Sequence, residues 1–136
     1  GAYRATFGVR RIATRPGGVI TLNGKRLNLR GASIHEDDRQ EGGAVSAATR
    51  RLFLNRLKNL GATITRSHYP LHPAFIEDLD RAGILYWVQA PVYQVPTKNW
   101  ERARVRSLAQ RAVERTVQNN ANHPSIFSWS IWSFFR

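Results

Sequence analysis

The sequence contains no cysteine, which excludes disulfide bonds and thiolate metal sites. It has no apolar run of about 18 residues and no charged, apolar leader at its start, so it predicts neither a membrane span nor a signal peptide. A chain without thiols suits any redox compartment, so its location stays open, with the cytoplasm as a default only. The 136 residues are 42% hydrophobic, which is enough for one domain with a sizeable core.

Acidic residues are scarce, with nine Asp and Glu against 21 Lys and Arg, and the net charge is +12. Such an excess raises the question of a nucleic-acid or anionic membrane partner. The basic residues are nevertheless scattered from Arg4 to Arg136, without a run of three and without an alternation of arginine and aromatic residues. We interpret them as a solvated basic surface, and we expect no specific nucleic-acid partner and no membrane partner.

The dipeptide Asn23-Gly24 separates two short segments, 19–22 and 25–29, that are suited to strands. A type I′ turn needs a positive φ angle at both central residues, which asparagine and glycine tolerate best. These residues therefore predict a β-hairpin.

Beyond the hairpin, strand-like and helix-like segments alternate. Ser46 is suited to cap a helix and Gly61 to end it, and a 3.6-residue apolar period is clearest between Glu101 and Ala121. Alternation of this kind is typical of parallel strands joined by helices. We predict four parallel strands over 27–33, 62–66, 84–88 and 125–131, with helices over 46–60, 73–82 and 101–121 between them.

Six short motifs resemble, in order and spacing, those of glycoside hydrolase family 2, which includes β-galactosidases, β-glucuronidases and β-mannosidases. They cover nearly the whole chain. They are Phe7-Gly8-Val9-Arg10, Leu22-Asn23-Gly24-Lys25, Leu29-Arg30-Gly31 leading to His35-Glu36-Asp37, Arg66-Ser67-His68-Tyr69-Pro70, Asp80-Arg81-Ala82-Gly83, and Asn122-His123-Pro124-Ser125-Ile126 leading to Trp129-Ser130.

The resemblance implies an α/β fold, a partial (β/α)₈ TIM barrel of about four β/α units after a short β-hairpin. Residues 1–15 would be the end of a preceding β-sandwich domain or a linker, and 16–136 the N-terminal half of the catalytic barrel. A complete barrel needs eight strands and roughly 250 residues. The outer strands of a half barrel would be unpaired, so we expect self-association through its open edges.

Reacting groups of such barrels lie at the C-terminal ends of the strands. His35 follows the first predicted strand, and Arg66, His68 and Tyr69 follow the second. The resemblance implies that His35 and His68 donate hydrogen bonds to the sugar and that Arg66 orients a catalytic carboxylate. Tyr69 belongs to the same substrate-facing group.

Without the resemblance, simpler interpretations come first. His68 would be a buried imidazole bonded to its neighbours, and 35–38 a solvated acidic loop. A divalent cation at His35 and the acids after it is an alternative, but such loops stay metal-free unless several carboxylates converge. We expect no metal and no cofactor. His72 is interpreted as a cap neighbour or loop residue, and His123, which precedes the fourth strand, as part of a structural turn.

Aromatic residues follow the third predicted strand. Tyr93 and Trp100 offer flat faces that could pack against a sugar ring, and packing within the loop is the alternative. Trp87 and Trp129 fall inside strands and are predicted to be core residues, although the resemblance allows one of them to line the floor of the pocket.

Retaining glycoside hydrolysis needs two carboxylates about 5–5.5 Å apart, and the resemblance supplies neither. Phe134 occupies the position of the family's acid/base glutamate, the nucleophile belongs to a later strand beyond the chain, and an amide, Gln89, replaces an acid after the third strand. These departures are consistent with a truncated or frame-disrupted reading frame. The other candidate acids are unsuited to form an opposed pair, because three share one loop and one lies in a helix: Glu36, Asp37, Glu41 and Glu77.

The leading interpretation is a glycoside hydrolase of carbohydrate metabolism that acts on a β-linked sugar and is incomplete and inactive on its own. The alternative is a non-catalytic module that binds carbohydrate or complements a partner, and its signature would be a complex that buries the open strand edges. A basic nucleic-acid binder is less favoured and would lose affinity steeply with salt. The residues that would distinguish galactoside, glucuronide and mannoside lie largely outside this sequence.

Overall fold

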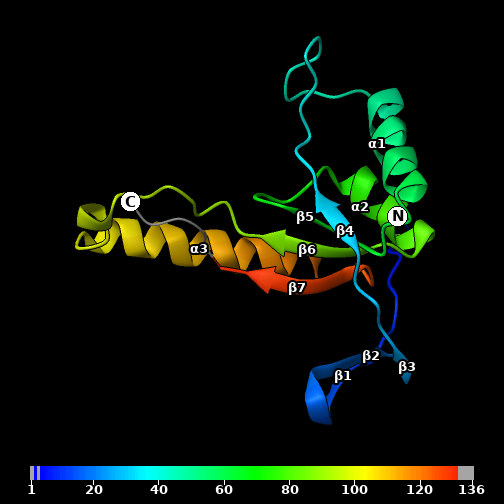
Figure 1. Cartoon of the computed structure of the whole chain (residues 1–136). Coiled ribbons are helices and arrows are strands. Elements are labelled where there is room, and N and C mark those ends of the chain that lie inside the picture. The colour runs from blue at the N-terminus through cyan, green and yellow to red at the C-terminus, as the bar shows by residue number, and fades with distance from the viewer. Residues whose placement is uncertain (1, 3, 132–136) are drawn as a thin grey trace.

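The computed structural model describes residue 2 and residues 4–131, which form two separate sheets (Figure 1). The first sheet is antiparallel and contains β1 (Ile12–Arg15), β2 (Val19–Leu22) and β3 (Lys25–Arg26). Asn23 and Gly24 join β2 to β3 with φ angles of 52° and 83°. The predicted hairpin is thus confirmed, with both turn residues in the left-handed region.

The second sheet has four parallel strands in the order β4-β5-β6-β7. Each strand pairs with the next one along the chain, which is the arrangement of half a (β/α)₈ barrel and confirms the predicted fold class. The first strand is shorter than predicted, because residues 27–30 lead from the hairpin into the sheet. The strands are β4 (Gly31–Ser33), β5 (Ile64–Ser67), β6 (Leu85–Gln89) and β7 (Ile126–Ser130).

Three helices connect the parallel strands at the predicted places: α1 (Ala47–Asn59), α2 (Pro73–Ala82) and α3 (Ala103–Asn120). Ser46 caps α1, with its hydroxyl accepting a hydrogen bond from the Thr49 amide at 3.2 Å. Proline at the first position of α2 needs no intrahelical partner for its nitrogen. Two short 3₁₀ turns, at Pro16–Gly18 and Thr97–Asn99, complete the secondary structure of the described residues.

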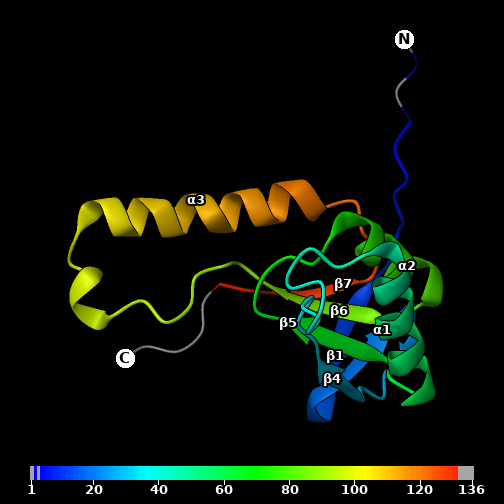
Figure 2. The same ribbon diagram turned by 90° about the horizontal axis from the view of Figure 1, so that it is seen from above.

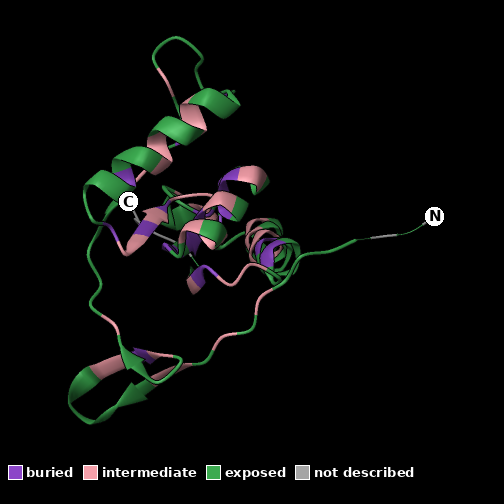
Figure 3. Ribbon diagram, turned by 90° about the vertical axis from the view of Figure 1, so that its right-hand side faces the viewer, coloured by how far each residue is buried: buried purple, intermediate pink, exposed green. Residues whose placement is uncertain are grey.

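The hydrophobic core lies between the parallel sheet and the helices α1 and α2, where Figure 3 shows the buried residues. In β6, Tyr86 and Val88 are completely buried on this side. The large, fully buried side chains of the core come from both helices and the two last strands: Leu57, Phe75, Ile76, Leu79, Tyr86, Val88 and Ile126.

Two predicted core residues are not enclosed, and that prediction was wrong. Trp87 is 42% exposed and Trp129 is 36% exposed. Trp87 lies on the face of β6 opposite to Tyr86 and Val88, and no helix of the described chain covers that face. Trp129 is in β7, which is an edge strand of the sheet. A half barrel lacks the second half that would cover both positions.

The helix α3 is only partly attached to the sheet. Its N-terminal portion extends past the strands (Figure 2), and only Thr116 and Asn120 of its residues are buried. Leu108 and Val117 of its apolar stripe are 50% and 37% exposed. Within the described residues, no helix is long and apolar enough to cross a membrane.

An N-terminal strap, defined here as residues 7–10, lies against the turn that precedes β7. The Gly8 amide donates to the Asn122 carbonyl at 3.4 Å, and the Arg10 guanidinium donates to the Ile126 carbonyl. The strap thus joins the start of the chain to the last parallel strand. The division of domains after Arg15 stays a prediction.

Replacing Gly8 with alanine should detach this strap. An added Cβ would lie 2.5 Å from Cβ and Cγ of Pro124, closer than van der Waals contact permits. We expect a loss of about 1–2 kcal/mol in the free energy of unfolding, measured with urea, because overpacking forces neighbours apart. An unchanged urea midpoint would show that the strap is not held against Pro124.

Candidate functional site

Four aromatic or imidazole rings meet at the C-terminal ends of the parallel strands. The His35 and His68 rings are stacked, with centroids 5.2 Å apart and planes inclined by 20°. Tyr69 lies 6.0 Å from His35, and Tyr93 lies 6.5 Å from His68. The loops after β4, β5 and β6 therefore bring together four of the six residues predicted to bind substrate.

Arg66, the fifth of these residues, lies beside the ring cluster at the end of β5. Its Nη1 is 3.2 Å from His68 Nε2, and its Nη2 donates to Gln89 Oε1 at 2.7 Å. A guanidinium can only donate, so His68 Nε2 must accept and its proton must be on Nδ1. Burial lowers the pKa of His68, and the charges of Arg66 and His35 lower it further, so the neutral ring is favoured.

The charge of Arg66 has no acidic partner in the described part of the chain. Its bonded neighbours are an imidazole and the completely buried amide of Gln89, and it forms no ion pair with a described carboxylate. The guanidinium also lies over the Trp87 ring, 5.5 Å from its centroid. Arg66 and Trp87 line a shallow pocket of about 200 Å³ with residues of β4 and β5.

Trp100, the sixth predicted residue, is not brought to the ring cluster. It lines a separate apolar pocket of about 320 Å³ between the loop after β6 and α3, with Val92, Ala109, Val113 and Ile131. The Trp100 carbonyl accepts a hydrogen bond from Arg106 at 2.6 Å, which fixes the backbone near the start of α3.

Two polar residues that support the cluster were not predicted as such. Glu36 is only 7% exposed, although the residues on both sides of it are exposed. Tyr86 is completely buried, and its hydroxyl contacts Ser67 Oγ, the Leu71 amide and the Tyr69 carbonyl. A tyrosine in an apolar strand was the only sequence signal, because a buried phenol requires a hydrogen-bond partner.

The other acids near β4 are used in local turns. Asp38 accepts hydrogen bonds from the amides of Gln40 and Glu41, and Glu41 accepts one from the Ser46 amide at 2.6 Å. These bonds lower the pKa of both carboxyls. Among the described residues, no group of three or more His, Cys, Asp or Glu could hold a metal ion. The predicted acid/base position, Phe134, lies outside the described residues.

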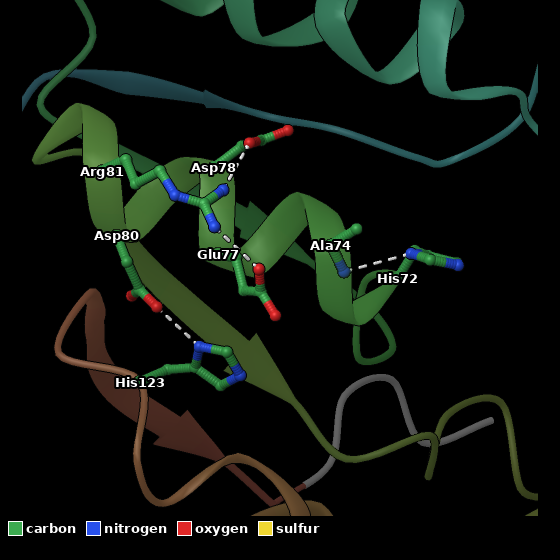
Figure 4. Close-up of polar contacts among 7 residues, drawn as sticks. All are labelled: His72, Ala74, Glu77, Asp78, Asp80, Arg81 and His123. Carbon is green, nitrogen blue, oxygen red and sulfur yellow. Dashed lines mark hydrogen bonds and ion pairs between the residues drawn. The ribbon is translucent and has the colours of Figure 1, made fainter. Parts of the chain in front are cut away.

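The remaining two histidines have structural contacts (Figure 4). His72 is the N-cap of α2, and its Nδ1 accepts from the Ala74 amide at 3.1 Å. His123 Nδ1 lies 2.6 Å from Asp80 Oδ2, and the other oxygen of Asp80 accepts from the Ser125 amide at 2.9 Å. The interpretation of His123 as part of a structural turn is confirmed, and His72, interpreted as a cap neighbour or loop residue, is the cap itself.

Comparison with known proteins agrees with this architecture. Residues 13–133 match the model of the TIM barrel domain of glycosyl hydrolases family 2. A β-galactosidase of Thermoanaerobacter pseudethanolicus is 30% identical over 132 residues, which are 95% of this chain and 17% of that protein.

Solved structures show the same relationship. A β-glucuronidase of Bifidobacterium dentium in complex with coumarin-3-O-glucuronide has a TM-score of 0.92 and 27% identity, over 98% of this chain and 22% of that one. A β-galacturonidase of Eisenbergiella tayi bound to galacturonate has a TM-score of 0.83 and 31% identity, over 90% of this chain and 22% of that one. This chain spans about a fifth of the length of these relatives. It belongs to glycosyl hydrolases family 2 and forms part of the TIM barrel domain of that family.

Proposed function

We propose that this chain supplies a sugar-binding wall in the active site of a retaining β-glycosidase. The observation that carries the proposal is the convergence of His35, Arg66 and His68 at the C-terminal ends of adjacent parallel strands. This end of a TIM barrel carries the active site. The solved relatives bound to galacturonate and to a glucuronide support a carbohydrate as the ligand.

Each residue of the cluster has a suitable chemical role. His68 is neutral, with its proton on Nδ1, an atom that the fold encloses, and Arg66 keeps a positive charge that can orient a carboxylate. The Tyr69 hydroxyl accepts from the Glu36 amide and still has its own proton to donate. Tyr93 is 45% exposed, so its ring face is available to a sugar. A substrate-binding role for Trp100 stays a prediction.

The same geometry leads us to propose that the chain alone does not catalyse hydrolysis. Retaining catalysis needs two carboxylates about 5–5.5 Å apart across the scissile bond. In the described residues, the acids that follow the strands lie in the single loop after β4, apart from Glu101 next to the start of α3, and β6 ends in the amide of Gln89. A general acid and a nucleophile on opposite sides of a sugar therefore have to come from other residues.

The purified chain is expected to show no turnover of a panel of aryl β-glycosides, including galactosides, glucuronides and galacturonides. Activity should require the remaining barrel segment, which can be supplied in trans or by replacing the matching segment of the T. pseudethanolicus β-galactosidase with residues 13–131. Hydrolysis by the chain alone would reveal an unforeseen pair of carboxylates and would contradict the proposal of inactivity.

In an active hybrid, His68→Asn should reduce kcat/KM by about 10²-fold, because Arg66 loses the imidazole that it contacts and the ring cluster loses its geometry. His72→Asn is the matched control, since it removes an imidazole a few residues away and keeps an acceptor at the helix cap. Equal activities of the two variants would exclude His68 from the binding site.

A second proposed role follows from the open sheet. β4 and β7 are edge strands in the described sheet, and Trp87 is exposed on a face that no described helix covers. We infer that these edges bind another polypeptide that completes the barrel or, without it, a second copy of the chain. If the chain alone has a monomeric solution mass at all concentrations tested, the proposed binding of a second copy is contradicted.

A further inference from the structure

Glu36 is a buried carboxylate beside the ring cluster. The residue is only 7% exposed, and its Oε1 is enclosed without a hydrogen-bond partner. Burial raises the pKa of this carboxyl, while the amide of His72 and the charges of His72 and Arg50 oppose the rise. A buried carboxylate is normally held by specific hydrogen bonds or by nearby charges.

Glu36 makes two hydrogen bonds with the loop after β5, one as acceptor and one as donor. Its Oε2 accepts from the His72 amide at 2.5 Å, and its own amide donates to the Tyr69 hydroxyl at 2.8 Å. The first bond lies at the N-terminus of α2, where the helix dipole also favours a negative charge. Glu36 is thus bonded to both ends of the segment 69–72.

The same segment is held from the core by Tyr86. The Tyr86 hydroxyl lies 3.1 Å from both the Leu71 amide and the Tyr69 carbonyl, and it also contacts Ser67 Oγ. The core therefore anchors the segment on one side and Glu36 anchors it on the other. His68 lies between Ser67 and Tyr69, so its ring position depends on both anchors.

We propose that Glu36 is a positioning residue that holds the loop after β5 so that His68 stacks on His35 and contacts Arg66. The inference rests on the proposed function, because these rings form its sugar-binding wall. The effect of Glu36 is local, since Tyr86 and the paired strands remain when the carboxylate is removed. Without it, the His72 amide loses its acceptor and the stack loses one of its two supports.

The test is a titration of the histidine ring signals by NMR, with the whole labelled chain and no sugar. In the unaltered chain, we expect a cross-relaxation signal between the His35 and His68 rings and a pKa of His68 below its ordinary value of 6.5, because of burial and of Arg66 and His35. The other ring that faces His68 is Tyr93.

Glu36→Ala should abolish the ring signal and move the pKa of His68 up towards 6.5, because the ring leaves its neighbours and becomes solvated. Glu36→Gln should retain both readouts, since an amide oxygen can accept from the His72 amide. This variant also separates the hydrogen bond from the charge. Asp37→Asn, an exposed neighbour, is the matched control and should change neither readout.

The proposal is overturned if Glu36→Ala keeps the ring signal and the low pKa of His68, or if Glu36→Gln loses them as fully as Glu36→Ala. If Glu36→Ala does not fold, Glu36→Asp replaces it, since the shorter side chain withdraws the carboxylate from the His72 amide. A weakened ring signal in Glu36→Asp would support the proposal, and an unchanged one would overturn it. An intact stack in a hybrid that neither binds nor hydrolyses sugar would instead refute the proposed function alone.

Discussion

Gly31→Ala is expected to separate β4 from the parallel sheet and to lower the free energy of unfolding by about 3 kcal/mol or more. An added Cβ would lie 1.7 Å from the Ile64 carbonyl oxygen and 2.7 Å from its carbon. Both atoms belong to the backbone of β5, so no change of rotamer can relieve the overlap. The loop with His35 and Glu36 starts from β4, so we also expect the ring cluster to lose its geometry.

Gly43→Ala is the matched control for this substitution. A Cβ at Gly43 would have no atom within 4 Å, so the same chemical change should leave stability nearly unaltered. Urea unfolding would compare the two variants, and hydrogen exchange at Ala32 and Ser33 would report on β4 directly. Equal stabilities would mean that β4 does not pack against β5 as closely as described.

Asp80→Ala should cost about 2–4 kcal/mol of stability, because it removes two charge-assisted contacts at once. The Asp80 carboxylate bonds to His123 Nδ1 at 2.6 Å and to the Ser125 amide at 2.9 Å, and it connects α2 to the turn before β7. The side chains of Asp80 and His123 are only 17% and 18% exposed, so water replaces these bonds poorly.

The neighbouring Asp78 provides the control for Asp80. Asp78 forms an ion pair with Arg81 (Figure 4). The arginine side chain is 68% exposed, so Asp78→Ala should cost less than about 1 kcal/mol. A double-mutant cycle of Asp80 and His123 would then isolate their coupling, expected at about 1 kcal/mol or more. A cost for Asp80→Ala as small as that for Asp78→Ala would contradict the role of this link.

The order and type of the secondary-structure elements could be predicted from the sequence, because the signals are local. Asn23-Gly24 sets the hairpin turn, Ser46 begins α1, and Pro73 begins α2. The boundaries of β4 could not be predicted, since residues 27–30 have strand-like composition but continue from the hairpin to the sheet. Leu27 donates to Ile20 of the hairpin, whereas Arg30 accepts from a segment far along the chain, at Thr63 and Ile64.

Enclosure of individual side chains was harder to predict than secondary structure. Periodicity identifies the face on which Trp87 lies, but whether that face is covered depends on elements packed against it. The apolar stripe of α3 is correct in period, yet Leu108 remains half exposed for the same reason. Both cases show that a local pattern reports the direction of a side chain and does not report its neighbours.

The sequence allowed us to predict which residues meet at the candidate site, but it did not allow us to predict their individual contacts. His35, His68 and Tyr69 could be placed together because the ends of adjacent parallel strands meet at one edge of the sheet. The burial of Glu36 within an otherwise exposed acidic loop could not be foreseen, because its bond to His72 joins two loops. Trp100 follows β6 as Tyr93 does, but the length of that loop carries it to α3.

The sequential order β4-β5-β6-β7 also determines how this segment can assemble during its synthesis. Chains are made at roughly 5–20 residues per second, much more slowly than short elements form, so each emerging strand meets a neighbour that already exists. The N-terminal strap is the exception, since Gly8 bonds to Asn122, which is translated much later. The residues of the strap therefore leave the ribosome well before their native partners exist.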